Sequence, residues 1–450
     1  MTEQLINYAK YYQEIWTHPS IKVRGKVVQV IGLVIEVTGL QPFVGEVCRV
    51  DVNGDSPVLA EVVGFRKGNS LLMPLGNLHG IGPGSPVTPL ERPLIVPVGR
   101  GLLGKVLDGL GNPLFEQDAE ISGEKVPVDN HPPNPLERNQ IRQVMPTGVR
   151  AIDTLLTCGM GQRLGIFSGS GVGKSTLLGM IARYSSADVS VIGLIGERGR
   201  EVVDFINNDL GEEGLKRSVV VVSTSDRPAL ERIKAAHVAT RIAEYFREQG
   251  LNVILMMDSV TRFAMALREV GLAIGEPPAT KGYTPSVFAA LPRLLERSGT
   301  SAAGSITGFY NVLVDGDDLN EPVSDAVRGI LDGHIVLSRE LAERNHYPAV
   351  DVLGSNSRLM PNLVDKKHRE KAARVKELLS TYKESEDLIN IGAYVKGSNP
   401  LVDKAIDYYP AINGFLRQDL SESITWEQSK QELKDLLSGD SDSSKNEEQE

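Results

Sequence analysis

The spacing of hydrophobic and polar positions changes several times along the chain, and the first change sets off a short N-terminal segment. Over residues 1–20 apolar positions recur every three or four residues and Pro19 follows them, which predicts one amphipathic helix. These positions are Leu5, Tyr8, Tyr12, Ile15 and Trp16. Because this aromatic-rich stripe lies at the terminus and a β pattern begins directly after it, we expect the helix to dock on a partner protein. Packing on its own domain is the alternative.

Residues 21–97 show the pattern of a small β-barrel. Short runs rich in Val and Ile alternate with glycine-containing turns, at a spacing that suits such a barrel. The runs are Lys22–Ile31, Gly32–Thr38, Glu46–Val52, Val58–Phe65 and Ser70–Met73. Pro and Gly then cluster at Gly80–Pro89, and a proline-rich connector follows at Pro132–Pro135.

From residue 163 onward, apolar β runs alternate with amphipathic helical stretches, which predicts a parallel α/β sheet with crossover helices. The expected strands are Leu164–Phe167, Val189–Ile195, Val219–Ser223 and Val253–Met257. The expected helices cover 174–184, 199–210 and 227–249, and a fourth begins at Ser259. We therefore expect a nucleotide-binding core over 98–364.

The C-terminal part of the chain divides into two further segments. Residues 365–437 are polar and helical in pattern, which predicts a helical domain. Residues 438–450 carry five acidic side chains against Lys445 and no large apolar group, so we expect a disordered acidic tail.

Composition narrows the class of protein. The 450 residues carry 48 Lys+Arg against 58 Asp+Glu, a net charge of −10, which disfavours a general nucleic-acid binder. Cys48 and Cys158 lie far apart in the sequence and are expected to be small buried side chains in a reducing compartment. The first residues lack a signal-peptide pattern, and no apolar run reaches about 18 residues. These features favour a cytoplasmic protein.

The strongest chemical signal is a glycine-rich loop between an expected strand and an expected helix. It reads Ser168-Gly169-Ser170-Gly171-Val172-Gly173-Lys174-Ser175-Thr176, with serine where the phosphate-loop pattern has its first glycine. Glycines let successive backbone N–H groups face an anion without a side chain in the way. We expect Lys174 to reach the β- and γ-phosphates of ATP and the Ser175 hydroxyl to bind Mg²⁺. A chance match without function is the alternative.

Two carboxylates at the ends of expected strands fit the rest of an ATP-hydrolysing site. Asp258 ends an apolar strand, where a carboxylate can complete the Mg²⁺ shell. It can also cap the next helix. Glu197 follows another strand, where it can polarise the attacking water, and Arg198 beside it can help hold the site. For Glu197 and Arg198, the alternative is ordinary surface charge in a loop.

Two other segments carry little chemical information by themselves. Arg358 ends the polar stretch Leu353–Arg358, for which an interface or surface salt bridge is the default interpretation. The acidic loop Asp315–Glu321 is compatible with an ordinary solvated turn.

Several stretches, in this order, resemble the flagellar/type III protein-export ATPase family, which is related to the catalytic subunit of rotary ATP synthases. They are Gly169–Thr176, Gly193–Glu201, Asp258–Arg262, Gly282–Ser286, Leu291–Arg297, Gly304–Thr307 and Tyr347–Asp351. The resemblance covers residues 20 to about 437. It implies an α/β fold, a RecA-like phosphate-loop core with an N-terminal small β-barrel and a C-terminal helical domain.

The resemblance also implies roles for matching residues. Glu197 matches the catalytic glutamate, with Arg198 near the γ-phosphate, and Arg262 matches a site arginine. Tyr347 matches the residue that stacks on adenine. Arg358 matches the arginine finger that acts on the nucleotide of the neighbouring subunit, so the site would be complete only in an oligomer.

The implied partners are those of an export motor. The family forms homohexamers, binds a stator or regulator dimer through an N-terminal helix and holds a coiled-coil stalk in a central pore, which the loop at 315–321 would face. It couples ATP hydrolysis to the release of export chaperones and the delivery of substrates to a membrane export gate, with which it associates peripherally. We expect a flagellum-specific member and no nucleic-acid partner.

Three alternatives stay open. An ion-translocating rotary ATPase subunit usually has Thr where Gly199 stands, and it carries a more acidic segment than the one at Glu384–Asp387. A Rho-type RNA translocase needs stacking aromatics in its barrel, whereas 21–97 holds only Phe43 and Phe65. An inactive scaffold conflicts with the intact loop and carboxylates.

Overall fold

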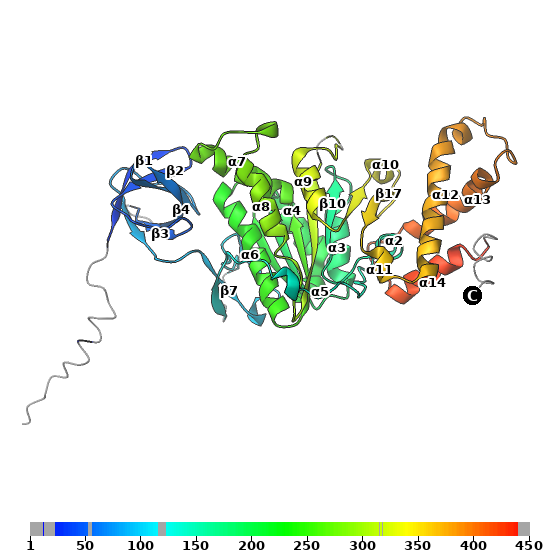
Figure 1. Ribbon diagram of the computed structural model, residues 1–450, viewed down its shortest axis with the longest axis horizontal. Helices are drawn as coiled ribbons and strands as arrows, with labels where there is room; N and C mark the ends of the chain where they lie inside the picture. The colour runs from blue at the N-terminus through cyan, green and yellow to red at the C-terminus, as the bar shows by residue number, and fades with distance from the viewer. Residues whose placement is uncertain are drawn as a thin grey trace, which may run out of the picture. The chain divides into compact units, whose positions relative to one another are not determined.

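The computed structural model in Figure 1 describes Tyr12 and residues 23–52, 56–115, 123–314, 316 and 318–439. The expected N-terminal helix, apart from Tyr12, and the expected tail from residue 440 onward lie outside the described residues. The chain divides into two compact units, one made of residues up to Leu94 with Val270–Glu276 and the other of the remaining residues. Within the described ranges, no helix combines the length and the apolar character that crossing a bilayer requires.

The first unit contains the expected barrel. Its strands pair in the closed order β1 (Gly25–Ile31), β2 (Val34–Thr38), β5 (Asn69–Pro74), β4 (Val58–Arg66), β3 (Val47–Val50) and β6 (Pro86–Pro89), and β6 pairs with β1. Neighbouring residues on a strand face opposite sides, so one set of alternating positions points inward. Apolar side chains at these positions, such as Ile35, Val37, Val62 and Leu72, form the barrel core.

The second unit is built on a mostly parallel sheet, in which the described residues form nine strands. The order is β17 (Val350–Ser357), β16 (Gly333–Leu337), β10 (Arg163–Ser168), β15 (Ser305–Leu313), β13 (Asn252–Asp258), β11 (Val189–Ile195), β12 (Ser218–Ser223) and β8 (Val106–Asp108), with β14 (Gly299–Thr300) paired to β15. β14 and β17 run antiparallel to their neighbours. The four expected strands are β10, β11, β12 and β13, each within one residue of its expected limits.

Helices connect these strands as expected for crossovers, with two local differences. The helices are α2 (Arg150–Leu155), α3 (Lys174–Tyr184), α4 (Gly199–Asp204), α5 (Gly211–Lys216), α6 (Ala229–Glu248), α7 (Val260–Ile274), α8 (Pro285–Leu295), α9 (Pro322–Ile330), α10 (Arg339–Glu343) and α11 (Met360–Leu363). The expected helix at 199–210 changes to a π-helical turn at Phe205–Leu210. Here α3 approaches closely, and a Cβ on Gly179 would lie 2.6 Å from the Asp209 carbonyl oxygen.

The second difference concerns the helix that follows β13. Asp258 is the last residue of the strand, and α7 begins two residues later. The Ser259 hydroxyl oxygen accepts a hydrogen bond from the Arg262 N–H at 3.3 Å. Ser259 therefore supplies the capping contact, and the Asp258 carboxylate serves other contacts.

The C-terminal helices share one hydrophobic core with the sheet. They are α12 (Lys366–Asn390), α13 (Pro400–Leu416) and α14 (Trp426–Leu436) (Figure 1). Arg150 in α2 strengthens this connection by donating hydrogen bonds to the carbonyl oxygens of Phe415 and Arg417, both at 3.0 Å. It also forms ion pairs with Glu422 and Glu432. The segment after α13 is thereby held against the nucleotide-binding sheet.

Candidate active site

The glycine-rich loop joins β10 to α3, as the sequence predicts. β10 lies between β15 and β16 in the sheet, and α3 begins at Lys174 directly after the loop. Gly171 and Gly173 have φ angles of 78° and 87°, which other residues adopt only with strain. A Cβ on Gly173 would also lie 3.2 Å from the Tyr347 ring. The loop is therefore a bare stretch of backbone at a helix N-terminus, which suits an anion.

Lys174 forms the central ion pair of the site. Its Nζ lies 2.8 Å from Asp258 Oδ1 and 3.7 Å from Glu197 Oε1. The same Asp258 oxygen accepts a hydrogen bond from Asn311 Nδ2 at 2.8 Å. Burial alone would lower the pKa of Lys174, but the two carboxylates outweigh it and raise that pKa. Lys174 is therefore a firmly charged cation between two acids that follow different strands.

Glu197 stands just beyond the end of β11. Burial, and after it the negative charge of Asp258, raise the pKa of Glu197 to about 7, although Lys174 works in the opposite direction. This carboxyl group exchanges protons near neutral pH, which is the range that a general base requires.

Arg262 reaches the site because of a glycine. Gly196 precedes Glu197 and has a φ angle of 70°. A Cβ at this position would lie 2.9 Å from the Cβ of Arg262. The close approach brings the first turn of α7 against the β11 loop, so Arg262 and Glu197 line the same pocket.

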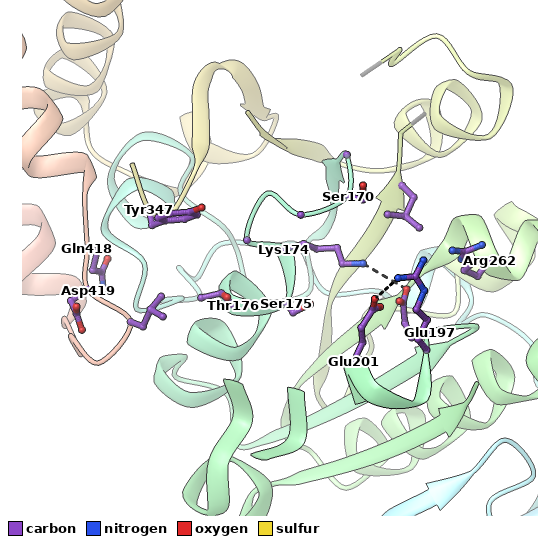
Figure 2. A pocket seen from close by; sticks show the side chains of 16 residues that line it. Ser170, Lys174, Ser175, Thr176, Glu197, Glu201, Arg262, Tyr347, Gln418 and Asp419 are labelled. Carbon is purple, nitrogen blue, oxygen red and sulfur yellow. Dashed lines mark hydrogen bonds and ion pairs between the residues drawn. The ribbon is translucent and has the colours of Figure 1, made fainter. Parts of the chain in front are cut away.

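The loop, Lys174, Glu197 and Arg262 line a pocket of about 680 Å³, whereas the buried Asp258 does not line it and is joined to it through Lys174. Figure 2 shows Tyr347 and Gln418 on one side of it, and Glu197 and Arg262 on the other. The pocket is lined by loop residues 169–171 and 173–176, Glu197, Arg198, Glu201, Arg262, Leu313, Tyr347 and residues 418–420. The backbone N–H of Gln418 donates to the Tyr347 carbonyl oxygen at 3.0 Å, so the C-terminal part of the chain helps hold the tyrosine.

The structure separates some predicted site residues from this pocket. Arg358 is exposed, does not line the pocket, and donates its backbone N–H to Asp332 O at 3.1 Å. Ser168 and Val172 are buried and also do not line it. Arg198 lies at the rim with its side chain 80% exposed, 3.4 Å from Glu201.

Sequence reasoning missed several residues of the site. Glu201 ends the stretch Gly193–Glu201, but the sequence pattern assigned no role to this residue. Asn311, Gln418 and Asp419 carry no local motif, and they reach the site through strand pairing and through the shared core. Asn311 shares its strand with other polar residues, Ser305 and Thr307, so the sequence offered no signal that singled it out.

The donor groups fit Mg²⁺ rather than a transition metal. Among the described residues, no three His, Cys, Asp or Glu side chains gather as a metal cluster. Mg²⁺ is commonly held by one or two protein oxygens together with phosphates and water, and Asp258 and Ser175 offer such oxygens. The Lys174 ammonium on Asp258 Oδ1 also shows that this oxygen accommodates a positive charge.

Family models match three parts of the chain. Residues 27–91 match the β-barrel domain of the ATP synthase alpha/beta family, and residues 148–357 match its nucleotide-binding domain. Residues 364–435 match the "T3SS EscN ATPase C-terminal domain". The C-terminal match distinguishes export ATPases from the wider group.

Individual relatives agree over nearly the whole chain. The "Flagellum-specific ATP synthase" of Bacillus subtilis is 58% identical, over 91% of this chain and 94% of the relative. The "Type 3 secretion system ATPase" of Xanthomonas euvesicatoria is 53% identical, over 90% and 91%. The assembled ATPase EscN of enteropathogenic E. coli superposes with a TM-score of 0.87 at 47% identity, covering 92% of this chain and 100% of EscN. The chain therefore belongs to the flagellar and type III secretion ATPase family and is an ATP-hydrolysing enzyme.

Proposed function

We propose that this protein is the hexameric motor of a flagellar export apparatus. It couples ATP hydrolysis to chaperone release and to the delivery of export substrates at a membrane gate, working from the cytoplasm as a peripheral protein. The observation that carries the proposal is the convergence of Lys174, Glu197 and Asp258 beside the glycine-rich loop. The C-terminal match to an export-ATPase domain favours this motor over an ion-translocating rotary subunit. The 58% identity to a flagellum-specific relative supports the flagellar assignment.

Nucleotide binding uses residues from both ends of the pocket. The loop N–H groups and Lys174 hold the phosphates, so Lys174 exchanges its Asp258 contact for the nucleotide. Ser175 and Asp258 hold Mg²⁺, which supplies positive charge against the phosphate oxygens. Tyr347 stacks on adenine, since its ring lines the pocket on the side opposite Glu197.

We assign hydrolysis to the side of the pocket that lies opposite Tyr347. Glu197 orients the attacking water and accepts its proton, and Arg262 and Arg198 supply positive charge near the γ-phosphate. Arg358 completes the site of the neighbouring subunit as an arginine finger. Its exposed position outside its own pocket supports a role in trans.

The partners follow from the hexamer. EscN has been solved as an assembled ATPase and in complex with its central stalk EscO, at TM-scores of 0.87 and 0.85 to this chain. These structures support a homohexamer with a central stalk in its pore. We assign to that pore a coiled-coil stalk that faces the acidic stretch 315–321. The aromatic stripe in residues 1–20 supports docking of a stator or regulator dimer.

Removal of either central charge should abolish turnover. Lys174→Ala and Glu197→Gln are each expected to lower the rate of phosphate release by at least about 100-fold. Arg200→Ala is the control, because that side chain is 91% exposed and pairs only locally with Asp204. Unchanged turnover in folded Glu197→Gln protein would contradict the assignment.

Glu197→Gln should also change stability in a pH-dependent way. The pKa of Glu197 rises from 4.5 to about 7 on folding, so the folded state binds the extra proton between these values. Stability therefore falls as pH rises through this window, and the ionised group is unfavourable at pH 8. We expect the free energy of unfolding of the variant, measured in urea, to be higher by about 1–3 kcal/mol at pH 8 and almost unchanged at pH 4, which lies below both pKa values. An equal effect at both pH values would refute the raised pKa.

The role of Arg358 in trans can be tested with mixed hexamers. Arg358→Ala and Lys174→Ala protein should each be inactive alone. Co-assembled in equal amounts, they place an intact loop beside an intact arginine at about a quarter of the interfaces, so activity should partly return. A mixture of Lys174→Ala with the Lys174→Ala/Arg358→Ala double variant is the control and should stay inactive. No recovery in the first mixture would exclude a role in trans.

Docking of the N-terminal segment can be tested by affinity purification. Full-length protein should retain one coiled-coil dimeric partner, and a chain without residues 1–20 should lose it while keeping ATP turnover. A chain without residues 440–450 is the control for terminal deletion. Equal recovery of the partner with all three chains would place the docking surface elsewhere.

A further inference from the structure

Polar side chains replace core residues at one end of the sheet face that packs on α3. On β13, Ile254 and Met256 belong to the hydrophobic core, and Asp258 is the next residue on the same face. On β15, Phe309 belongs to that core, and Asn311 is the next residue on its face. Asn311 is fully buried, at 0% exposure. It stands at the border between the core and the pocket.

The side-chain amide of Asn311 donates a hydrogen bond to Asp258. Its Nδ2 donates to Asp258 Oδ1 at 2.8 Å, the same oxygen that Lys174 Nζ contacts at 2.8 Å. Among the described residues, the buried Asn311 Oδ1 has no hydrogen-bond partner. A buried acceptor without a partner is unfavourable, so an apolar side chain would suit a purely structural position better. The hydrogen bond to Asp258 is what the amide adds.

We propose that Asn311 is a positioning residue that holds the Asp258 carboxylate for metal binding. The inference rests on the proposed function, in which Asp258 binds Mg²⁺ and Lys174 moves to the phosphates. Once Lys174 leaves, Asn311 is the remaining donor to Asp258 Oδ1 among the described residues. A short side chain on a central strand keeps that carboxylate oriented, whereas a long lysine does not.

The same pair of strands offers a matched control. At the other end of β15, the Ser305 hydroxyl donates to Asn252 Oδ1 at 2.9 Å. This contact also joins β15 to β13, and Ser305 is 5% exposed. Ser305→Ala therefore removes a comparable side-chain hydrogen bond far from the phosphate loop.

The test is binding of a fluorescent ATP analogue, mant-ATP, to the full-length chain over a Mg²⁺ titration. Asn311→Leu and Asn311→Ala are expected to raise the Mg²⁺ midpoint by roughly tenfold, because a hydrogen bond to a charged group is lost. Binding without Mg²⁺ should stay within about twofold of the parent, since loop and Lys174 are intact. Asn311→Thr keeps a donor and should lie near the parent, as should Ser305→Ala.

The outcomes separate this inference from the proposed function. If the parent chain binds mant-ATP without any response to Mg²⁺, the proposed function itself fails. If the parent responds and Asn311→Ala responds equally, only the positioning role is overturned. Equal weakening in Ser305→Ala would show that strand pairing, not the contact to Asp258, sets the affinity, and would also overturn it. Should Asn311→Leu not fold, the contrast between Asn311→Ala and Asn311→Thr decides the question.

Discussion

The site depends on a single constraint, which is that a buried carboxylate must have a cation beside it. Asp258 is 4% exposed and contacts Lys174 at 2.8 Å, so neither charge is buried alone. Glu197 stands 3.7 Å from the same ammonium and therefore receives less of its charge. Burial, and after it the negative charge of Asp258, outweigh that attraction and raise the pKa of Glu197 to about 7. One carboxylate is suited to a metal ion and the other to a proton.

The order of the strands places Lys174 within reach of the two carboxylates. β10, which carries the loop, is separated from β13 by β15, and β11 lies beyond β13. Lys174 therefore reaches across the end of β15 to meet Asp258 and Glu197. Asn311 is the residue of β15 that contacts Asp258 from the sheet. Parallel strands bring these groups together because their carboxyl ends meet at one edge.

The opposite end of the pocket depends on the C-terminal helices. Gln418 donates to the Tyr347 carbonyl oxygen and also to Gly148 O, so one residue connects the tyrosine to the start of α2. These helices share the hydrophobic core of the sheet, and close-packed cores transmit displacements. A displacement of the helices would therefore also displace the side of the pocket that Tyr347 and Gln418 form.

Much of this protein was predictable from local sequence. The glycine-rich loop, the barrel, four sheet strands and the carboxylates Asp258 and Glu197 each have a short-range signal, in periodicity or in residue spacing. The resemblance to export ATPases added the expected roles of Tyr347 and Arg358, which stay predictions. The prediction of one helix over 199–210 was only partly correct. Its second half is a π-helical turn, at the place where Gly179 packs closely on Asp209.

The sequence by itself determined which residue types carry the chemistry and on which elements they lie. Only the tertiary structure decided their partners, because those contacts join residues far apart in the chain. Lys174 and Asp258 are 84 positions apart, and Gln418 and Gly148 are 270 apart. Periodicity reports which face of a strand is buried, but not which strand lies beside it. Strand order and the shared core therefore made Asn311 and Gln418 part of the site.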